Sequence, residues 1–230
     1  MHHASRIVFV ALPLLALALS ACEDPAKDAP KATVSSAAPT AVKTAAPAAS
    51  AAPTAAATAA AAPAAGGLKI DSATSSVDFV GSKVTGTHAG KFEKFSGTVA
   101  LDGDTIETAK IAIEIDMASV KSDDEKLDGH LKSPDFFDVE KFPKATFTST
   151  EIKAGGEGGA THTITGELEL HGVKKTVSFP AKITLTEAEV AATSEFSINR
   201  KDFAIVYPGM TNDLIRDDVV IKLAIKAPRK

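Results

Sequence analysis

The sequence is poor in several residue types, and each shortage excludes a class of protein. The 230 residues include one Cys, one Tyr and no Trp. A single Cys cannot form a disulfide within the chain, and it excludes a zinc site built from several Cys. The formal net charge is only −4, and Lys and Arg form no dense cluster, so we expect no nucleic-acid partner.

The first 21 residues have the pattern of a targeting segment. Arg6 gives a weakly positive start, and residues 7–19 are apolar with one interruption at Pro13. This run is short for a transmembrane helix, which needs about 20 apolar residues, and is typical of a signal peptide. Its end, Leu-Ser-Ala before Cys22, resembles a bacterial lipobox. The resemblance implies a periplasmic protein anchored to a bacterial membrane by a lipid on Cys22. The alternative is a free thiol beside an ordinary cleavage site.

Residues 22–67 have the composition of a linker. Positions 23–67 hold 21 Ala and 6 Pro, with no aromatic residue. Recurrent Pro interrupts the helix that Ala favours, and nothing here can form a core. We therefore predict a disordered, semi-extended tether with a reach of roughly 40 Å as a coil and roughly 140 Å as extended polyproline chain. A chain that starts at Leu68 should then fold and melt like the mature protein.

Residues 68–230 have the period-two alternation of β-strands. In the clearest strand, isoleucines at 111, 113 and 115 share one face, and Lys110, Glu114 and Asp116 lie on the other. Other apolar series of this kind are Val77 and Phe79; Val99 and Leu101; Ala145 and Phe147; Ile164, Leu168 and Leu170; Val177 and Phe179; Ile183 and Leu185; and Val219, Ile221, Leu223 and Ile225.

Alternation of this kind predicts strands with one buried and one wet face, which is typical of an antiparallel sheet. Connections such as residues 155–159 and 171–172 are short and contain Gly. We predict an all-β, antiparallel domain of roughly eight strands. The pattern alone leaves a sandwich and a closed barrel open.

One stretch interrupts the strands. Ser122 is a plausible N-cap, and residues 123–125 place three carboxylates in the first turn of a short helix that Pro134 must end. Phe136 and Phe137 follow in an otherwise polar turn before the next strand begins after Pro143. These two rings either plug one end of the domain permanently or line the mouth of a cavity as a gate.

Three blocks of sequence carry a resemblance to a known family. They are residues 128–149, DGHLKSPDFFDVEKFPKATFTS; residues 166–175, GELELHGVKK; and residues 196–203, FSINRKDF. Together they resemble the YceI family, and the likeness covers essentially all of 68–230. The resemblance implies a lipocalin-like β-barrel that binds polyisoprenoid lipids. One departure is Ala204, where the family usually has Gly.

The chain offers little for catalysis. His130 and His171 lie in the matching blocks, but no ligand set accompanies them, so we expect turn histidines and no metal or other cofactor. Ser133 and Ser149 lack the surroundings of an activated nucleophile. Arg200 has two interpretations: an ion-pair partner on the outer surface, or a positive group near a lipid head. We predict no catalytic residue.

Our interpretation is a membrane-tethered, non-catalytic protein that binds, sequesters or carries a polyisoprenoid-type lipid inside the barrel. The alternatives are an enzyme acting on isoprenoid lipids and a structural barrel with a filled core. The oligomeric state is open, a homodimer included. The residues predicted to line the lipid site are Phe79, Ile111, Ile113, Ile115, Leu131, Phe136, Phe137, Phe147, Leu168, Leu170, Phe179, Arg200 and Phe203.

Overall fold

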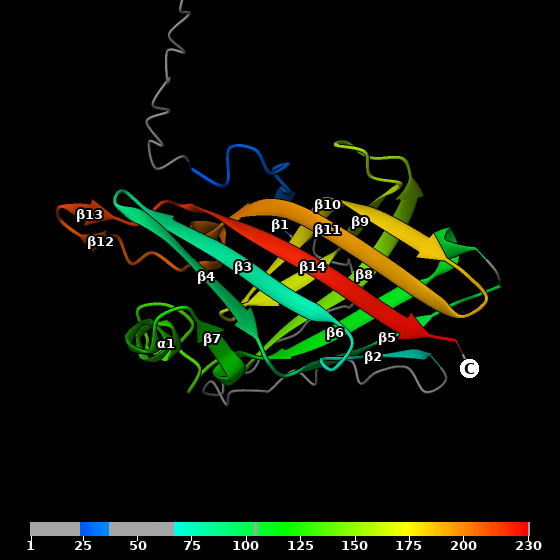
Figure 1. Cartoon of the computed structure of the whole chain (residues 1–230), viewed down its shortest axis with the longest axis horizontal. Helices are drawn as coiled ribbons and strands as arrows, with labels where there is room; N and C mark the ends of the chain where they lie inside the picture. Colours follow the sequence, from blue (N-terminus) through cyan, green and yellow to red (C-terminus); the bar gives the residue numbers. More distant parts are fainter. Residues whose placement is uncertain (1–23, 37–66, 104, 230) are drawn as a thin grey trace, which may run out of the picture.

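The structure is a computed structural model, and it describes residues 24–36, 67–103 and 105–229 (Figure 1). Most of the described residues belong to one antiparallel sheet. In chain order its strands are β1 (Thr33–Ser36), β2 (Leu68–Asp71), β3 (Ser76–Lys83), β4 (Gly86–Phe92), β5 (Phe95–Ala100), β6 (Lys110–Asp116), β7 (Val120–Ser122), β8 (Lys144–Ala154), β9 (His162–Leu170), β10 (Val173–Leu185), β11 (Glu189–Asn199) and β14 (Asp218–Pro228). The remaining elements are the small hairpin β12 (Gly209–Met210) and β13 (Asp213–Leu214), the helix α1 (Glu125–Lys132), and the 3₁₀ turns η1 (Ile106–Thr108), η2 (Met117–Ser119) and η3 (Arg200–Phe203).

The sheet is strongly curled. Its strands follow the order β2-β5-β6-β8-β9-β10-β11-β14-β3-β4-β7, and the curl brings β2 against β14 (Figure 1). The predicted all-β, lipocalin-like architecture with one short helix is confirmed. The predicted count of roughly eight strands is low, because the described residues form twelve strands of this sheet, several of them very short.

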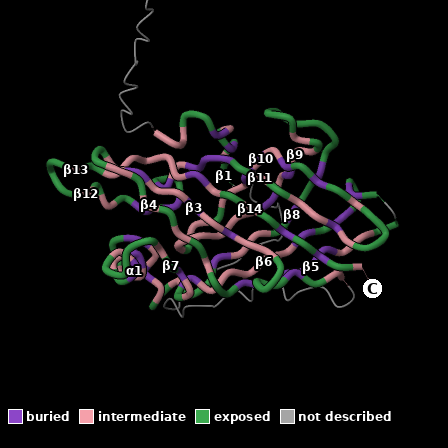
Figure 2. Tube along the Cα trace, viewed as in Figure 1, coloured by how far each residue is buried: buried purple, intermediate pink, exposed green. Residues whose placement is uncertain are grey.

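The inner face of the curled sheet is the core. In β6 the isoleucines at 111, 113 and 115 point inward, as their alternation predicts, and buried positions recur along the other long strands (Figure 2). Strand β8 keeps Ala145, Phe147 and Ser149 on the inner face. A bulge between Ser149 and Glu151 then shifts the alternation by one residue, so that Ile152 faces inward.

The N-cap of the helix lies two residues later than predicted. Asp124 caps α1, with its carboxylate accepting the N–H of Lys126 at 2.8 Å. Ser122 instead ends β7, and its N–H and hydroxyl both donate to the carboxylate of Asp128. Pro134 lies just beyond the helix, which ends at Lys132, as predicted. Past η3, Ala204 has a φ of 58°, a left-handed conformation that favours Gly and explains the usual family residue.

The prediction that residues 23–67 do not pack on the domain is wrong for residues 24–36. Residues 33–36 form β1, which pairs with residues 175–178 of β10, and the N–H of Ala32 donates to the carbonyl of Ser197 in β11 at 2.9 Å. Ala32 is only 5% exposed and belongs to the core. The segment therefore fills a gap in the barrel wall between β10 and β11.

Pro180 gives a physical reason for this gap. Strands β10 and β11 pair only at residues 182–185 and 190–193. The carbonyl of Pro180 faces β11, since it accepts the hydroxyl of Ser194, and in a strand the N–H of a residue points to the same side as its carbonyl. Proline lacks that N–H, so the β10–β11 ladder loses a donor there and stops. Strand β1 supplies the missing partner beyond this point.

The position of β1 changes the role expected of the Ala/Pro-rich run. Strands β1 and β2 both belong to the barrel, so residues 37–66 connect two strands of one sheet. Only Glu23 then separates the predicted lipid anchor at Cys22 from the first described residue, Asp24. Residues 1–23, including Cys22 and the predicted signal peptide, lie outside the described residues.

Candidate functional site

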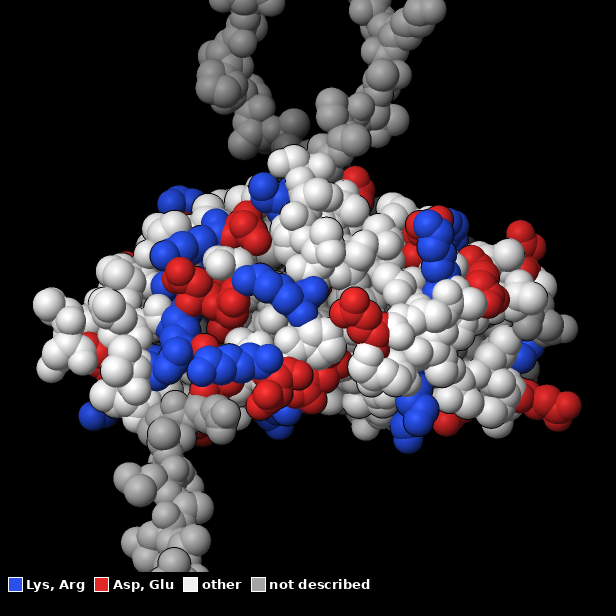
Figure 3. All heavy atoms as spheres, turned by 90° about the horizontal axis from the view of Figure 1, so that it is seen from above, with Lys and Arg blue, Asp and Glu red and all other residues white. Residues whose placement is uncertain are grey.

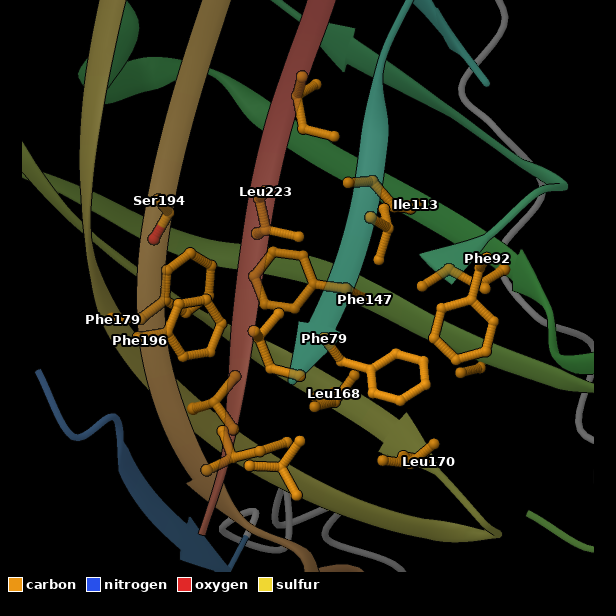
Figure 4. A pocket seen from close by; sticks show the side chains of 18 of the residues that line it. Phe79, Phe92, Ile113, Phe147, Leu168, Leu170, Phe179, Ser194, Phe196 and Leu223 are labelled. Carbon is orange, nitrogen blue, oxygen red and sulfur yellow. The ribbon is translucent and has the colours of Figure 1, made fainter. Parts of the chain in front are cut away.

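The curled sheet holds a partly open apolar cavity of about 240 Å³. It runs along the interior from the inner face of β6 to that of β11 and β14, as the close view in Figure 4 shows. Among the described residues that line it, the only side chains with polar groups are Thr193, Ser194 and Arg200. The hydroxyl of Ser194 is bonded to the carbonyl of Pro180. The cavity surface is therefore almost entirely hydrocarbon.

The structure brings together all but one of the residues predicted to line the site. Phe203 is the exception: it is fully buried but does not line the cavity, and its carbonyl lies 3.1 Å from Nδ1 of His171. The 3₁₀ turn η3 interrupts the period of two before Phe203, so strand alternation does not give its direction. The predicted residues that line the cavity are Phe79, Ile111, Ile113, Ile115, Leu131, Phe136, Phe137, Phe147, Leu168, Leu170, Phe179 and Arg200.

An aromatic row crosses the middle of the cavity. Phe147 and Phe179 have ring centroids 5.7 Å apart, and Phe179 stacks on Phe196 at 4.3 Å with an interplanar angle of 11° (Figure 4). Gly166 makes room for this row, because a Cβ at its position would meet the ring of Phe147. Rings of this kind give a ligand a smooth apolar wall.

A second aromatic group closes the end of the cavity next to α1. The ring of Phe92 lies 5.7 Å from that of Phe79 and 5.8 Å from that of Phe137. Phe136 packs edge-on against His130 at 4.9 Å and lies 5.4 Å from Tyr207. Both Phe136 and Phe137 line the cavity, so the aromatic turn forms its end wall.

The helix beneath this wall is fixed by one carboxylate. Asp128 accepts hydrogen bonds from the N–H and hydroxyl of Ser122 and pairs with the ammonium of Lys121 at 2.7 Å. The hydrogen bonds from Lys121 and then from Ser122 lower the pKa of Asp128 to about 2. The carboxylate is therefore charged at neutral pH, and it holds α1 and the aromatic turn against β7.

Arg200 lines the cavity, as predicted, but it does not have the first of its two predicted roles. Its side chain is 5% exposed, which excludes an ion pair on the outer surface. Its guanidinium donates to the carbonyls of Ile205 at 2.8 Å, Arg216 at 3.1 Å and Ile215 at 3.4 Å, and to Asp217 at 3.2 Å. Burial lowers the pKa of Arg200, and Asp217 partly offsets this. These bonds tie together the two ends of the loop that carries β12 and β13.

The histidines make local contacts. Nε2 of His130 lies 3.0 Å from the carboxylate of Asp135, and the ring of His171 packs on Phe142 at 4.9 Å. No three His, Cys, Asp or Glu within the described part of the chain lie together as metal ligands would. In the same part of the chain, no helix has the length and hydrophobicity to cross a membrane.

The predicted site residues include twelve of the thirty-five described residues that line the cavity, although strand alternation indicated the direction of several others. The alternation of β14 placed Val219, Ile221, Leu223 and Ile225 on one face, and the same rule applied to β11 would have found Phe196 and Ile198. Ile205 and Ile215 lie in irregular chain on either side of the β12–β13 hairpin, where no periodicity indicates direction. Phe92 ends β4, whose sequence has weak alternation.

Comparisons with known proteins agree with this architecture. The YceI-like domain profile matches residues 68–227. UPF0312 proteins of Pseudomonas fluorescens and Pseudomonas savastanoi pv. phaseolicola are 34% and 35% identical over 139 and 138 residues, which are 58% and 56% of this chain and 71% and 70% of theirs.

Solved structures give the same answer. BcnA of Burkholderia cenocepacia superposes with a TM-score of 0.61 at 27% identity, over 69% of this chain and 99% of that one. A polyisoprenoid binding domain from Saccharophagus degradans shares the fold, with a TM-score of 0.57 at 17% identity over 71% of this chain and 99% of that one. Because the matched profile spans more than half of the sequence, the chain belongs to the family of YceI-like domains.

Proposed function

We propose that this protein binds a polyisoprenoid-type lipid in the barrel cavity without transforming it. The observation that carries the proposal is the continuous hydrocarbon lining of the described cavity. Its one charged side chain, Arg200, donates at least four hydrogen bonds to residues of the loop that carries β12 and β13. Such a cavity offers dispersion and burial to an apolar chain and offers no described polar constellation for chemistry. The YceI-like family and the polyisoprenoid binding neighbour support the same ligand class.

The dimensions of the cavity suggest how much chain it takes. At about 240 Å³ the cavity is somewhat smaller than the roughly 300–1,000 Å³ of pockets that bury a drug-sized ligand, so it fits a short prenyl segment of about two isoprene units. Burial of each C5 unit contributes at most roughly 3–4 kcal/mol from area arithmetic. Two units then contribute at most roughly 6–8 kcal/mol, which is comparable to the lower part of the cost of immobilising the ligand, about 4–15 kcal/mol. A longer prenyl chain needs the aromatic end wall at Phe136 and Phe137 to move.

We further propose that the protein is held to a bacterial membrane in the periplasm through a lipid on Cys22. The support is the sequence of residues 1–22 alone. The test is fractionation of cells that express Cys22→Ser. The variant should move from the membrane fraction to the soluble periplasm, whereas continued membrane association would contradict a lipid anchor.

The ligand is tested by extracting lipids from protein purified without detergent and analysing them by mass spectrometry. An intact prenyl chain, bound in stoichiometric amount, is expected. A chemically altered prenyl product would favour an enzyme, and an empty extract together with no binding of added prenyl alcohol would favour a filled core.

Two neighbouring alanines of β11 give a matched control for this test. Ala192 lines the cavity, and Ala191, which pairs with Lys226 of β14, does not. Ala192→Phe places a ring in the void and should abolish prenyl binding. Ala191→Phe adds the same ring on the other face and should bind like the parent protein.

A further inference from the structure

The large apolar side chains that are exposed in the described part of the chain all lie in two loops at one end of the barrel. Val84 is 56% exposed in the β3–β4 turn, Val206 is 63% exposed before β12, and Met210 and Leu214 in the β12–β13 hairpin are 68% and 50% exposed. This end, on the left in Figure 3, shows mostly uncharged surface, with the charged side chains set farther along the molecule. We call Val84, Val206, Met210 and Leu214 the apolar tip.

The two loops hold each other in place. The N–H of Val84 donates to the carbonyl of Leu214 at 3.1 Å. Asp213 accepts hydrogen bonds from the N–H and hydroxyl of Thr85 at 3.1 and 2.9 Å, and pairs with Lys83 at 2.8 Å. The pKa of Asp213 is lowered, chiefly by its hydrogen bond with Lys83. Hydrogen bonds and an ion pair between the two loops therefore hold the residues of the apolar tip together as one surface.

The apolar tip is also continuous with the cavity. Ile205 and Ile215 line the cavity, and their chain neighbours Val206 and Leu214 are exposed at the tip. The bonds of Arg200 to the carbonyls of Ile205 and Ile215 hold both ends of this loop. The exposed surface of the tip and the cavity wall are thus formed by adjacent residues of the same loop.

The start of the described chain lies at the same end. Asp24 forms an ion pair with Arg216 at 3.1 Å, and Arg216 follows Ile215 directly. Two peptide units separate Asp24 from Cys22, a reach of at most about 7 Å. A lipid on Cys22 would therefore enter the membrane close to the apolar tip.

From these observations we propose that the apolar tip docks on the surface of a lipid bilayer and sets the cavity end beside the membrane from which the ligand is taken. The inference rests on the proposed lipid-binding function for its purpose, but docking itself is measured separately. Exposed apolar clusters of this kind mark protein or membrane contacts, and the nearby anchor selects the membrane. Because Lys83 and Arg216 are already paired with Asp213 and Asp24, docking should not require anionic lipids.

The test uses the full mature chain with Cys22→Ser, so that no lipid anchor masks a weaker contact. Its partition onto neutral phosphatidylcholine vesicles is measured by sedimentation. The variant Val206→Asp with Met210→Asp puts two charges on the tip, where exposure leaves the fold undisturbed. The matched control is Ala73→Asp with Ala188→Asp, which adds two charges to exposed loops at the opposite end of the barrel.

We expect the tip variant to bind vesicles at least tenfold more weakly than the parent and the control variant to bind like the parent. In vesicle-free buffer all three should bind geraniol equally, and the tip variant should take a fluorescent prenyl analogue from vesicles more slowly. Three results would overturn the proposal. The parent does not bind vesicles, both variants lose binding equally, or the tip variant converts a dimer to a monomer while its vesicle binding is unchanged. Vesicle binding without any geraniol binding would support docking and contradict the proposed function.

Discussion

The two edges of strand β10 are built in different ways. On one edge β10 pairs with β9 in an unbroken ladder of nine residue pairs, from Val173 with Leu170 to Ala181 with His162. On the other edge it pairs with β11 for four residue pairs only, and β1 takes over beyond Pro180. One edge is a local hairpin, and the other depends on a segment some 140 residues earlier in the chain.

From this difference we expect the β9 edge of the strand to be the more stable wall and the β1 edge to be the one that opens first. A hairpin edge closes with little loss of chain entropy, because its partners are neighbours in sequence. The β1 edge is filled by a four-residue strand with few buried side chains, which is typical of a region with low local stability. The family profile begins at residue 68, so β1 lies outside the part of the chain that it matches.

The largest effect should come from damage to the hairpin edge. Ile164 in β9 is 4% exposed and lines the cavity opposite Phe179. Ile164→Asp would bury a carboxylate with no partner, and we expect a loss of at least about 4 kcal/mol in the free energy of unfolding, or no folded protein. Urea denaturation followed by circular dichroism measures this loss. A folded variant with near-parental stability would contradict the described core.

Removal of the inserted segment should have a smaller but clear effect. A chain that starts at Gly67 lacks β1 and leaves the edges of β10 and β11 without partners beside Pro180. We expect it to remain a β-barrel, with a melting temperature about 5–10 °C lower, which corresponds to roughly 2–3 kcal/mol for a domain of this size. Calorimetry of the two chains decides, and equal melting temperatures would restore the sequence-based interpretation of residues 22–67 as a tether.

A charge within the inserted segment should cost no more than the loss of the whole segment. Ala32→Asp places a carboxylate in the core, but β1 can detach and take the charge into water. We therefore expect a destabilisation at or below that of the deletion. The control is Ser35→Asp on an exposed position of β1, which should change the free energy of unfolding by less than about 0.5 kcal/mol. A larger effect of Ala32→Asp than of the deletion would mean that β1 cannot leave the wall independently.

The smallest effect is expected at the ion pair before β1. Asp24→Asn removes the pairing with Arg216, whose side chain is partly exposed, and pairs of this kind contribute about 0.2–1 kcal/mol. The melting temperature should fall by at most about 4 °C, and the difference should shrink in high salt. A fall in melting temperature as large as that of the deletion would mean that the contacts of the first residues of the segment, and not those of β1, provide its stabilising effect.

The barrel and most of its inner wall could be predicted from the sequence, because alternation in strands such as β6 and β14 shows which side chains face the interior. The insertion of β1 could not, since Ala32 and Val34 lie in a low-complexity run with no apolar face and their partners are distant. One signal was present: Pro180 within a strand pattern predicts an edge or a break in the ladder. The surface ion pair considered for Arg200 was wrong, because the partners that bury this side chain lie in irregular chain at residues 205–217, which strand alternation does not place.

The central claim, that the cavity binds a prenyl chain by burial of hydrocarbon, is tested most directly by calorimetric titration of prenyl alcohols of increasing length. Since the protein has no Trp, calorimetry replaces intrinsic fluorescence. We predict that the affinity rises at least tenfold from the C5 to the C10 alcohol and levels off between C10 and C20, as a cavity of about 240 Å³ fills, with little dependence on the head group. Affinity that is independent of chain length from C5 to C20, or no binding of any prenyl alcohol, would contradict the claim.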